Sequence, residues 1–239
     1  MLKQQLIWGV TVALTFVLGG EVWGQDVEKR MVSPAIQLTS VKTRQSGTGF
    51  IHEYGLSRND LARIRQLPHI RQAIPSRTID TRASHGDRQV NIRLTGTTPP
   101  LAGMFGVRVV LGRFLSDADV TQFNNVAVID SAAARRLFPG AKAIGKNIRI
   151  NNHYFLIVGE TKSPASGLDV YIPISTMRVR LGDIVIHTST GARWGERFEI
   201  SRILLRMDDP RSVRKTAETV QHLLEQFHEQ GDYAIQLLP

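Results

Sequence analysis

The sequence predicts an α+β fold, and two observations lead to this prediction. Segments with the two-residue alternation of strands and segments with the periodicity of amphipathic helices follow one another in mixed order, and they add up to about eight to ten strands and four or five helices. Hydrophobic residues make up 42 % of the 239 residues, which is enough for a buried core in one domain or in two small lobes. The sequence has no repeat of fixed period, so a solenoid is not predicted.

Residues 1–24 have the organisation of an export segment. Lys3 precedes an apolar run over residues 6–20, and the small residue Gly24 stands at the −1 position of a cleavage site. The run is shorter than the ~20 apolar residues of a membrane span. This favours a signal peptide, while an N-terminal membrane anchor remains the alternative. Either interpretation places residues 25–239 outside the cytoplasm, in the periplasm.

Strands and one short helix are expected in the first part of the exported chain. Ser57 is the expected N-cap of a helix over residues 58–66, Asp60 completes a weak capping box, and Pro68 stops the helix. Strands are expected at 35–42, 70–82 and 88–96, with a flexible loop at 44–49 and a turn at 84–87.

Short strands and single helical turns are expected in the middle of the chain. Ser116 or Asp117 caps one helical turn, and Asp130 or Ser131 caps a helix that ends at Pro139-Gly140. The pair Asn151-Asn152 suits a two-residue turn and predicts a hairpin over 147–159. The other expected elements are strands at 107–112, 125–130 and 169–175, a short helix to about Leu181, and a surface loop over 182–196.

The strongest helix signal lies near the C-terminus, after an expected strand at 200–207. Asp209 is the N-cap, Pro210 takes the first helical position, and Gly231 ends the helix. A closing strand follows over 232–238. One face of the helix is expected to be buried, because apolar residues recur at spacings of four and three: Val213, Ala217, Val220, Leu224 and Phe227.

A basic stretch over residues 134–160 invites comparison with a phosphate-binding loop. Gly140, Gly145 and Lys146 have the spacing of such a loop, but Asn147 stands where a hydroxyl is required for magnesium. A helix precedes Gly140 and a strand follows Lys146, which reverses the required order. We therefore expect the glycines to shape turns, with the basic side chains in solvent around four buried residues: Leu137, Phe138, Ile148 and Ile150.

The composition limits the classes of function. Lys and Arg number 30 against 21 Asp and Glu, which favours contact with an anionic surface or partner, although a solvated charged face is the more common explanation. The chain has no cysteine, so disulfides and thiolate sites are excluded. The aromatic residues do not interleave with the basic ones, so nucleic acid is not an expected partner.

The sequence patterns identify no catalytic, cofactor-binding or metal-ligating residue. His222 and His228 lie six residues apart, roughly 240° around a helix, and cannot share a metal ion. Ser212 and Lys215 match a Ser-x-x-Lys pattern, but no Lys-Thr-Gly partner accompanies them, and a helix-start serine is the better interpretation. The sequence therefore predicts a protein that is not an enzyme.

Several stretches, in this order, resemble the extracytoplasmic, MacB-like periplasmic core domain of MacB/FtsX-type ABC transporter permeases: 61–77, 96–99, 112–120, 125–150, 154–160, 170–176 and 223–237. The resemblance implies a two-lobed α+β fold. A porter-like α/β lobe would comprise 33–96 with 197–239, and an inserted β-rich lobe would comprise 97–196. The residues that match the family pattern are expected to be architectural: Gly112, Arg113, Phe114, Phe138, Pro139, Gly145 and Pro173.

The resemblance also implies a function without chemistry. Such domains belong to systems that couple cytoplasmic ATP hydrolysis to movements outside the membrane, in export or mechanotransmission. This sequence ends at Pro239, where the later membrane helices of the family begin, and it has no ATP-binding part. The expected partners are therefore a membrane permease subunit and a cytoplasmic ATPase, with an anionic membrane surface as a further candidate. The alternative is a free-standing exported binding protein for a lipid, peptide or protein partner.

Overall fold

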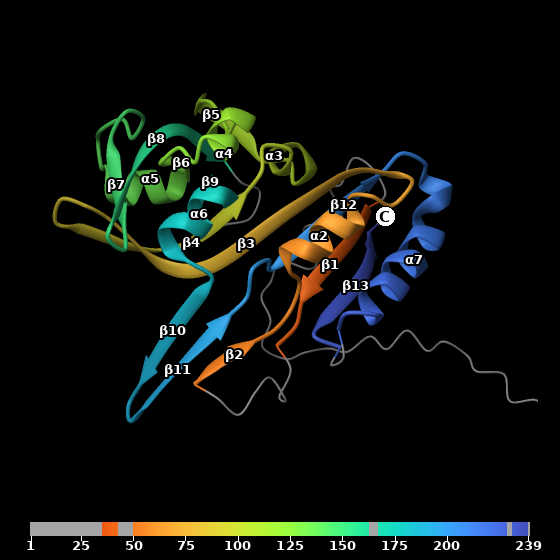
Figure 1. Ribbon diagram of the computed structural model, residues 1–239. Helices are drawn as coiled ribbons and strands as arrows, with labels where there is room; N and C mark the ends of the chain where they lie inside the picture. The colour runs from red at the N-terminus through yellow and green to blue at the C-terminus, as the bar shows by residue number, and fades with distance from the viewer. Residues whose placement is uncertain (1–34, 43–49, 163–166, 229–230, 239) are drawn as a thin grey trace, which may run out of the picture.

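A single large sheet runs through the molecule (Figure 1). The computed structural model describes residues 35–42, 50–162, 167–228 and 231–238, and within these ranges ten strands form this sheet, in the order β13-β1-β12-β3-β4-β9-β6-β8-β5 with β7 beside β3 and β8. The strands are β1 Ala35–Ser40, β3 Ile70–His85, β4 Arg88–Thr97, β5 Arg108–Gly112, β6 Val126–Asp130, β7 Asn147–Ile150, β8 His153–Lys162, β9 Asp169–Pro173, β12 Arg202–Met207 and β13 Tyr233–Leu238. A mixed α/β fold in which strands dominate is confirmed.

Two helices cover one end of the sheet. They are α2 (Arg58–Ile64) and α7 (Val213–Glu225), the latter preceded by a 3₁₀ turn, η1 (Pro210–Ser212). In Figure 1, α2 lies in front of β1 and β12, and α7 runs beside β13. The helices and the sheet bury one core between them, which includes Ile36, Leu38, Leu61, Ile64, Ile203, Leu205, Val220 and Leu224.

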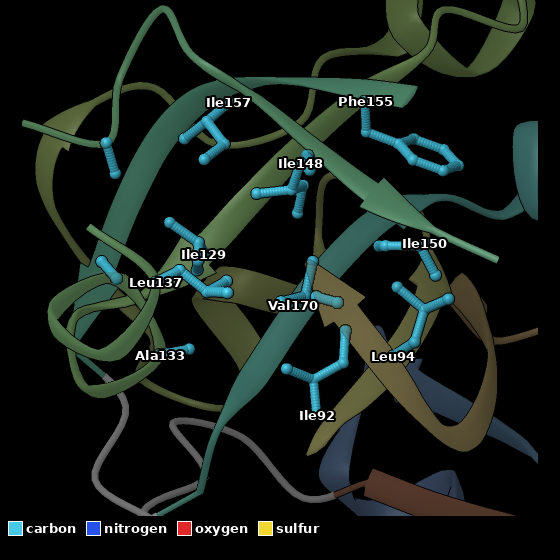
Figure 2. Close-up of a cluster of buried hydrophobic side chains, with 14 of the residues drawn as sticks. Ile92, Leu94, Ile129, Ala133, Leu137, Ile148, Ile150, Phe155, Ile157 and Val170 are labelled. Carbon is cyan, nitrogen blue, oxygen red and sulfur yellow. The ribbon is translucent and has the colours of Figure 1, made fainter. Parts of the chain in front are cut away.

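A second core fills the other end of the sheet (Figure 2). The helices there are α5 (Ser131–Leu137) and α6 (Ile174–Leu181). Their apolar side chains meet alternate residues of β4, β6, β7, β8 and β9, because successive strand residues point to opposite faces. The buried side chains include Ile92, Leu94, Ile129, Leu137, Ile148, Phe155, Ile157 and Val170.

A third core joins these two ends on the opposite face of the sheet. Single helical turns, α3 (Leu101–Met104) and α4 (Asp117–Thr121), lie near it. It brings Ala35 and Leu238, from the first and last strands of the sheet, into the same cluster as residues of β6 and β9. The sheet is therefore packed on both faces over part of its length.

Residues 182–196, expected as a surface loop, instead form most of a second sheet. Strands β10 (Ile184–Ser189) and β11 (Ala192–Arg197) make an antiparallel hairpin, and β2 (Ile51–Glu53) adds to β11 in parallel. The expectation was wrong because the strands are short and their pairing partner, β2, is distant in the sequence. Gly191, with φ of +80°, permits the hairpin turn.

The last helix is also less regular than predicted. Asp209 caps the 3₁₀ turn, with its side chain accepting a hydrogen bond from the Arg211 N–H, and the α-helix begins at Val213. Phe227 was expected on the buried face, but it lies beyond the end of α7 and is 50 % exposed. The Arg63 guanidinium lies over its ring at 3.6 Å, so a cation–π contact replaces burial in the core.

Most local predictions from turn and cap residues are confirmed. Ser57 and Ser116 both form capping boxes, with Asp60 and Asp119 respectively, and Asp130 caps α5. Asn151 has φ of +51° in the β7–β8 turn. The export segment and the 44–49 loop lie outside the described residues. Among the residues described, no helix is long and apolar enough to cross a membrane.

The basic stretch has the order predicted for it, with helix α5 before Gly140 and strand β7 after Lys146. Gly140 and Gly145 have φ of +71° and +79° and shape the turns that connect α5 to β7. The four expected core residues are buried: Leu137, Phe138, Ile148 and Ile150. A phosphate loop is therefore excluded here by topology.

Phe123 occupies a position after α4 that normally favours glycine. Its φ is +56°, its side chain is 42 % exposed, and the following N–H, of Asn124, bonds back to the Asp119 carbonyl at 3.0 Å. We expect Phe123→Gly to raise the free energy of unfolding by about 1 kcal/mol, because glycine removes the steric cost of the left-handed conformation. Urea denaturation measures the change. Phe123→Ala, which removes the ring and keeps the strain, should give no gain; an equal gain in both variants would refute the backbone explanation.

Candidate functional site

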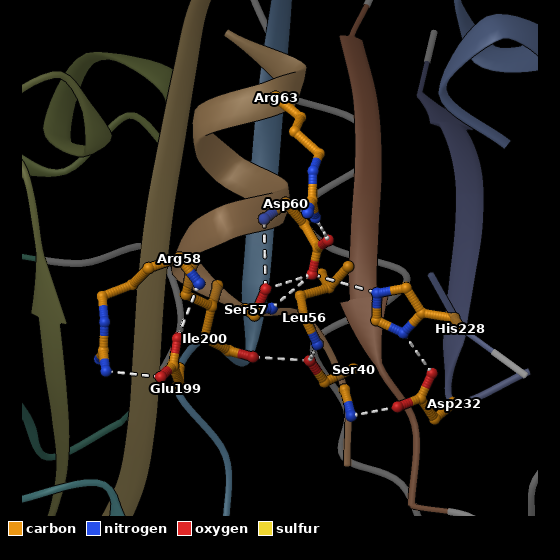
Figure 3. A network of polar contacts seen from close by, with 11 residues as sticks. Ser40, Leu56, Ser57, Arg58, Asp60, Arg63, Glu199, Ile200, His228 and Asp232 are labelled. Carbon is orange, nitrogen blue, oxygen red and sulfur yellow. Dashed lines mark hydrogen bonds and ion pairs between the residues drawn. The ribbon is translucent and has the colours of Figure 1, made fainter. Parts of the chain in front are cut away.

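His228, just after α7, lies at the centre of a buried polar network (Figure 3). Its side chain is 8 % exposed. Nδ1 lies 2.7 Å from Asp232 Oδ1, and Nε2 lies 3.1 Å from Asp60 Oδ2. An imidazolium, which carries a proton on both ring nitrogens, donates to both carboxylates at once. The ring thus links the end of α7 to the start of β13 and to α2.

Asp60, in the first turn of α2, receives the largest number of bonds in this network. Its Oδ2 accepts from the Ser57 backbone N–H at 2.8 Å and from the Ser57 hydroxyl at 2.6 Å, and Arg63 reaches Oδ1 at 3.1 Å. Burial alone would raise the pKa of this carboxyl, but the bonds from Ser57 and His228 outweigh burial and lower it. Asp60 is therefore held as a carboxylate although it is buried.

The network continues into the turn before α2. Asp232 Oδ2 accepts the Gly55 N–H at 2.5 Å, and the Ser40 hydroxyl accepts the Leu56 N–H at 2.8 Å and donates to the Ile200 carbonyl at 2.6 Å. A side chain at Gly55 would meet Ser40 Cβ at 2.4 Å. Side chains and backbone from β1, the turn before α2, α2, the end of α7, the start of β13 and the segment before β12 are thereby fastened at one point. We call this set of residues, Ser40, Ser57, Asp60, His228 and Asp232, the clasp.

A second polar cluster attaches the three-stranded sheet to the rest of the molecule. Arg58 binds Asp183 at 2.9 Å and also binds Glu199; these carboxylates belong to the segments that enter β10 and leave β11. Arg77 is 2 % exposed, donates to the Gly182 carbonyl, and lies 4.8 Å from the Phe198 ring. Burial lowers the pKa of Arg77. Both ends of the β10–β11 hairpin are therefore held by arginines of α2 and β3.

The clasp resembles a catalytic constellation only in its residue types. The Ser57 hydroxyl donates to Asp60, and the two ring nitrogens of His228 lie against Asp232 and Asp60, so the cluster contains no hydroxyl–imidazole contact of the kind that joins a nucleophile to its base. Within the described ranges no group of three or more His, Asp or Glu side chains could hold a metal ion. The arrangement can fix the relative positions of strands and helices, and we assign it that structural role.

A groove of about 660 Å³ crosses the β3–β4 ribbon where β9 begins. Beside it lies the buried Asp169, whose Oδ1 is 2.8 Å from Arg93 Nε and whose Oδ2 has no hydrogen-bond partner among the described residues. Burial raises the pKa of Asp169, the bond from Arg93 opposes this, and the nearby Asp130 adds to it. The residues that line the groove are both polar and apolar: Asp80, Thr81, Arg82, Asn91, Ile92, Arg93, Gly167 and Leu168.

The residues expected to be architectural mostly contact backbone or core. A side chain at Gly112, where φ is +70°, would meet the Val158 carbonyl at 2.3 Å. The Phe114 ring packs against Tyr171 at 5.5 Å. Phe138 and Pro173 are buried, Gly145 shapes a turn, and Pro139 is exposed.

Arg113 and Asp119 form a pair that makes an acid-dependent contribution to stability. Asp119 is 1 % exposed and accepts bonds from Arg113, Ser116 and Asn124, which outweigh burial and lower its pKa far below the usual range. A carboxyl with a lowered folded-state pKa stabilises the fold above its unfolded pKa near 3.8, and the effect is lost as the pH falls below that value.

We therefore expect Asp119→Asn to destabilise the protein at pH 7 and to flatten the decline of stability between about pH 5 and pH 2, because the loss begins near the unfolded pKa of 3.8 and continues toward the lower folded-state pKa. Urea midpoints across this range are the measurement. Asp117 is an exposed neighbour on the same helix, and in the control variant Asp117→Asn the urea midpoint should change with pH as it does in the wild type. If the urea midpoints of the wild type and Asp119→Asn fall equally with pH, Asp119 does not make the acid-dependent contribution to stability.

Sequence reasoning identified Asp60 only as a helix cap and compared His228 only with metal sites. The Ser57-x-x-Asp60 spacing was the available signal for half of the clasp. The other half depends on the approach of residues 60 and 228, which are 168 positions apart in the chain. No local pattern predicts such a contact.

Comparison with known proteins agrees with this architecture. The model of the MacB-like periplasmic core domain family matches residues 6–223. Among curated relatives, the macrolide export ATP-binding/permease protein MacB of Aggregatibacter actinomycetemcomitans is 22 % identical over 95 % of this chain and 35 % of its own length. The Pasteurella multocida MacB is 28 % identical over 53 % of this chain and 20 % of its own length. The chain thus spans about a fifth to a third of the relatives that it matches.

Two solved structures have the same fold. The periplasmic region of MacB from Actinobacillus actinomycetemcomitans superposes with a TM-score of 0.67 at 20 % identity, over 84 % of this chain and 87 % of that one. The extracellular domain of the ABC-type transporter YknZ from Gram-positive bacteria gives 0.66 at 16 % identity, over 86 % and 100 %. With the family match over most of its length, this chain belongs to the MacB-like periplasmic core domain family.

Proposed function

We propose that this protein is the non-catalytic, extracytoplasmic part of an ABC-type export or mechanotransmission system, or an accessory to one. The observation that carries the proposal is the family match over residues 6–223. Residues 33–96 with 197–239 would form a porter-like lobe, and 97–196 an inserted lobe. Its partners would be a membrane permease subunit, on this or another polypeptide, and a cytoplasmic ATPase.

The architecture supports a mechanical role. Strand β3 runs between the two helix-covered ends: it pairs with β12 over residues 70–76 and with β4 from Ser76↔Thr97 to His85↔Arg88. The clasp, and the polar cluster around Arg58 and Arg77, hold the neighbouring segments in place beside β3. A displacement applied at one end is therefore transmitted through hydrogen-bonded strands, without a flexible linker between them.

Co-purification tests the proposal. The full chain, tagged and expressed in its own host, should recover a membrane-spanning permease subunit and an ATP-binding subunit from detergent-solubilised, cross-linked membranes, as identified by mass spectrometry. An unrelated exported protein with the same tag is the control. Repeated recovery of neither subunit above this control would contradict the proposal.

A second candidate function, that of an exported binding protein, is favoured by the groove beside Asp169. Native mass spectrometry of the purified protein would then show a co-purifying small molecule. Asn91→Trp, which places an indole in the groove from an exposed strand position, should remove the additional mass. A bare protein mass for the unaltered chain would dismiss this candidate and leave the first one untouched.

A further inference from the structure

The β3–β4 turn, α5 and the β7–β8 hairpin lie at the end of the molecule opposite α7 and β13 (Figure 1), and they carry six basic residues. Between Ser131 and Val158 the sequence has five Lys or Arg and no Asp or Glu. The sixth, at position 88, lies at the turn between β3 and β4. We call this set the basic end: Arg88, Arg135, Arg136, Lys142, Lys146 and Arg149.

Specific contacts bring the three segments of the basic end together. Arg149 pairs with Ser84 across β7 and β3, and its Nε lies 3.3 Å from the Ser84 hydroxyl. His85 lies 2.8 Å from the Asn147 carbonyl, and its ring lies 4.4 Å from the Phe138 ring at the end of α5. The β3–β4 turn, the end of α5 and the β7–β8 hairpin therefore form one continuous surface.

The charges of this surface are not neutralised internally. Five of the six side chains are exposed and Lys146 is half-buried, with Nζ 5.4 Å from the Phe138 ring. None of the six makes an ion pair within the residues that the structure describes. The only carboxylate in the β3–β4 turn is Asp87. A positive potential of this kind attracts anions from solution.

Apolar side chains accompany the charges. Tyr154 is 63 % exposed and is the direct cross-strand neighbour of Arg149; Leu156 is 41 % exposed and is the neighbour of Asn147. Cross-strand neighbours project from the same face. The outer face of the β7–β8 hairpin therefore presents an aromatic ring and an isobutyl group beside a guanidinium, the combination that suits the interface between phospholipid headgroups and acyl chains.

We propose that the basic end binds the surface of an anionic phospholipid bilayer. Three turns form this surface, so it suits a broad partner, whereas an acidic peptide would favour a groove or a free strand edge. Arginine pairs with phosphate through two parallel N–H groups. Tyr154 and Leu156 would enter the headgroup region while the basic side chains contact the phosphates. This inference does not depend on the proposed function.

Vesicle co-sedimentation with the full chain tests it. Vesicles of phosphatidylcholine alone are compared with an equal mixture of phosphatidylcholine and phosphatidylglycerol. The apolar N-terminal run is the same in every sample, so the difference between the two vesicles isolates the contribution of charge. We expect tighter binding to the mixed vesicles, and loss of that difference at salt of about 0.5 M, where the screening length is a few ångströms.

Charge-matched variants locate the surface. Each basic residue near an anionic bilayer changes affinity by about fivefold, so the triple variant Arg135→Gln/Arg136→Gln/Lys142→Gln should weaken binding to mixed vesicles by up to about a hundredfold. The control, Arg211→Gln/Arg214→Gln/Lys215→Gln, removes the same charge from exposed positions at the opposite end and should change little. Tyr154→Ser should also weaken binding, with circular dichroism unchanged.

Three results would overturn the inference. They are equal binding to both vesicle types, equal losses in the two triple variants, and wild-type binding by the basic-end triple variant. In the last case the charges would be available for a partner of another class, such as an acidic protein.

Discussion

Gly159→Ala is expected to destabilise the protein by roughly 3 kcal/mol or more, which is the upper range for overpacking a buried site. A Cβ at Gly159 would lie 1.9 Å from the Arg113 carbonyl oxygen and 2.9 Å from the carbonyl carbon. These are backbone atoms, so no side chain can rotate to relieve the clash. Gly159 also pairs with Gly112 of β5, so β8 and the segment that follows β5 would have to move apart.

Equilibrium denaturation in urea measures this effect, and Gly103→Ala is the matched control. Gly103 lies in α3, and a Cβ there meets nothing within 4 Å. The control should stay within about 0.5 kcal/mol of wild type. If both variants unfold at the wild-type midpoint, the close approach of β5 and β8 is not present in solution.

Asp60→Ala is expected to cost about 3 to 5 kcal/mol, because it removes one partner from a buried charged network. The Ser57 N–H and Nε2 of His228 would lose their acceptor in a site where Asp60 is 2 % exposed. Asp60→Asn, which keeps the volume and one acceptor oxygen, should be intermediate. Thermal or urea unfolding, with far-UV circular dichroism as the signal, provides the measurement.

Asp209→Ala separates this effect from ordinary cap loss. Asp209 also caps a helical turn, through the Arg211 N–H at 2.9 Å, but it is exposed. Its replacement should cost about 1 kcal/mol. Equal losses at positions 60 and 209 would mean that the network around His228 contributes nothing beyond a helix cap.

The sequence was most informative where structure is decided locally. Ser57 and Ser116 predicted helix starts because a hydroxyl that accepts a backbone N–H satisfies the helix terminus within four residues. Asn151 predicted a hairpin turn because its own backbone tolerates positive φ. The basic stretch was also interpreted correctly, since the alternation of Ile148, Arg149 and Ile150 separates core from solvent.

Prediction failed where the deciding contact is distant in the chain. The third strand beside the β10–β11 hairpin consists of residues 51–53, which are far away in the sequence. Phe227 likewise makes its cation–π contact with the distant Arg63. The clasp has the same character, because Asp60 lies 168 positions from His228 in the chain and meets it only where α2 and α7 pack on the same end of the sheet. Neither periodicity nor turn chemistry contains information about such pairings.

The pairing of β1 with β13 determines how the protein would respond to tension. Ala35 and Leu238 are directly opposite one another, so the outer ends of the first and last strands leave the sheet side by side. Pulling these ends apart loads the hydrogen bonds between the strands one after another, and β13 would peel from the edge at low force. Moving both ends together loads no single bond, and the whole body would then travel as a unit.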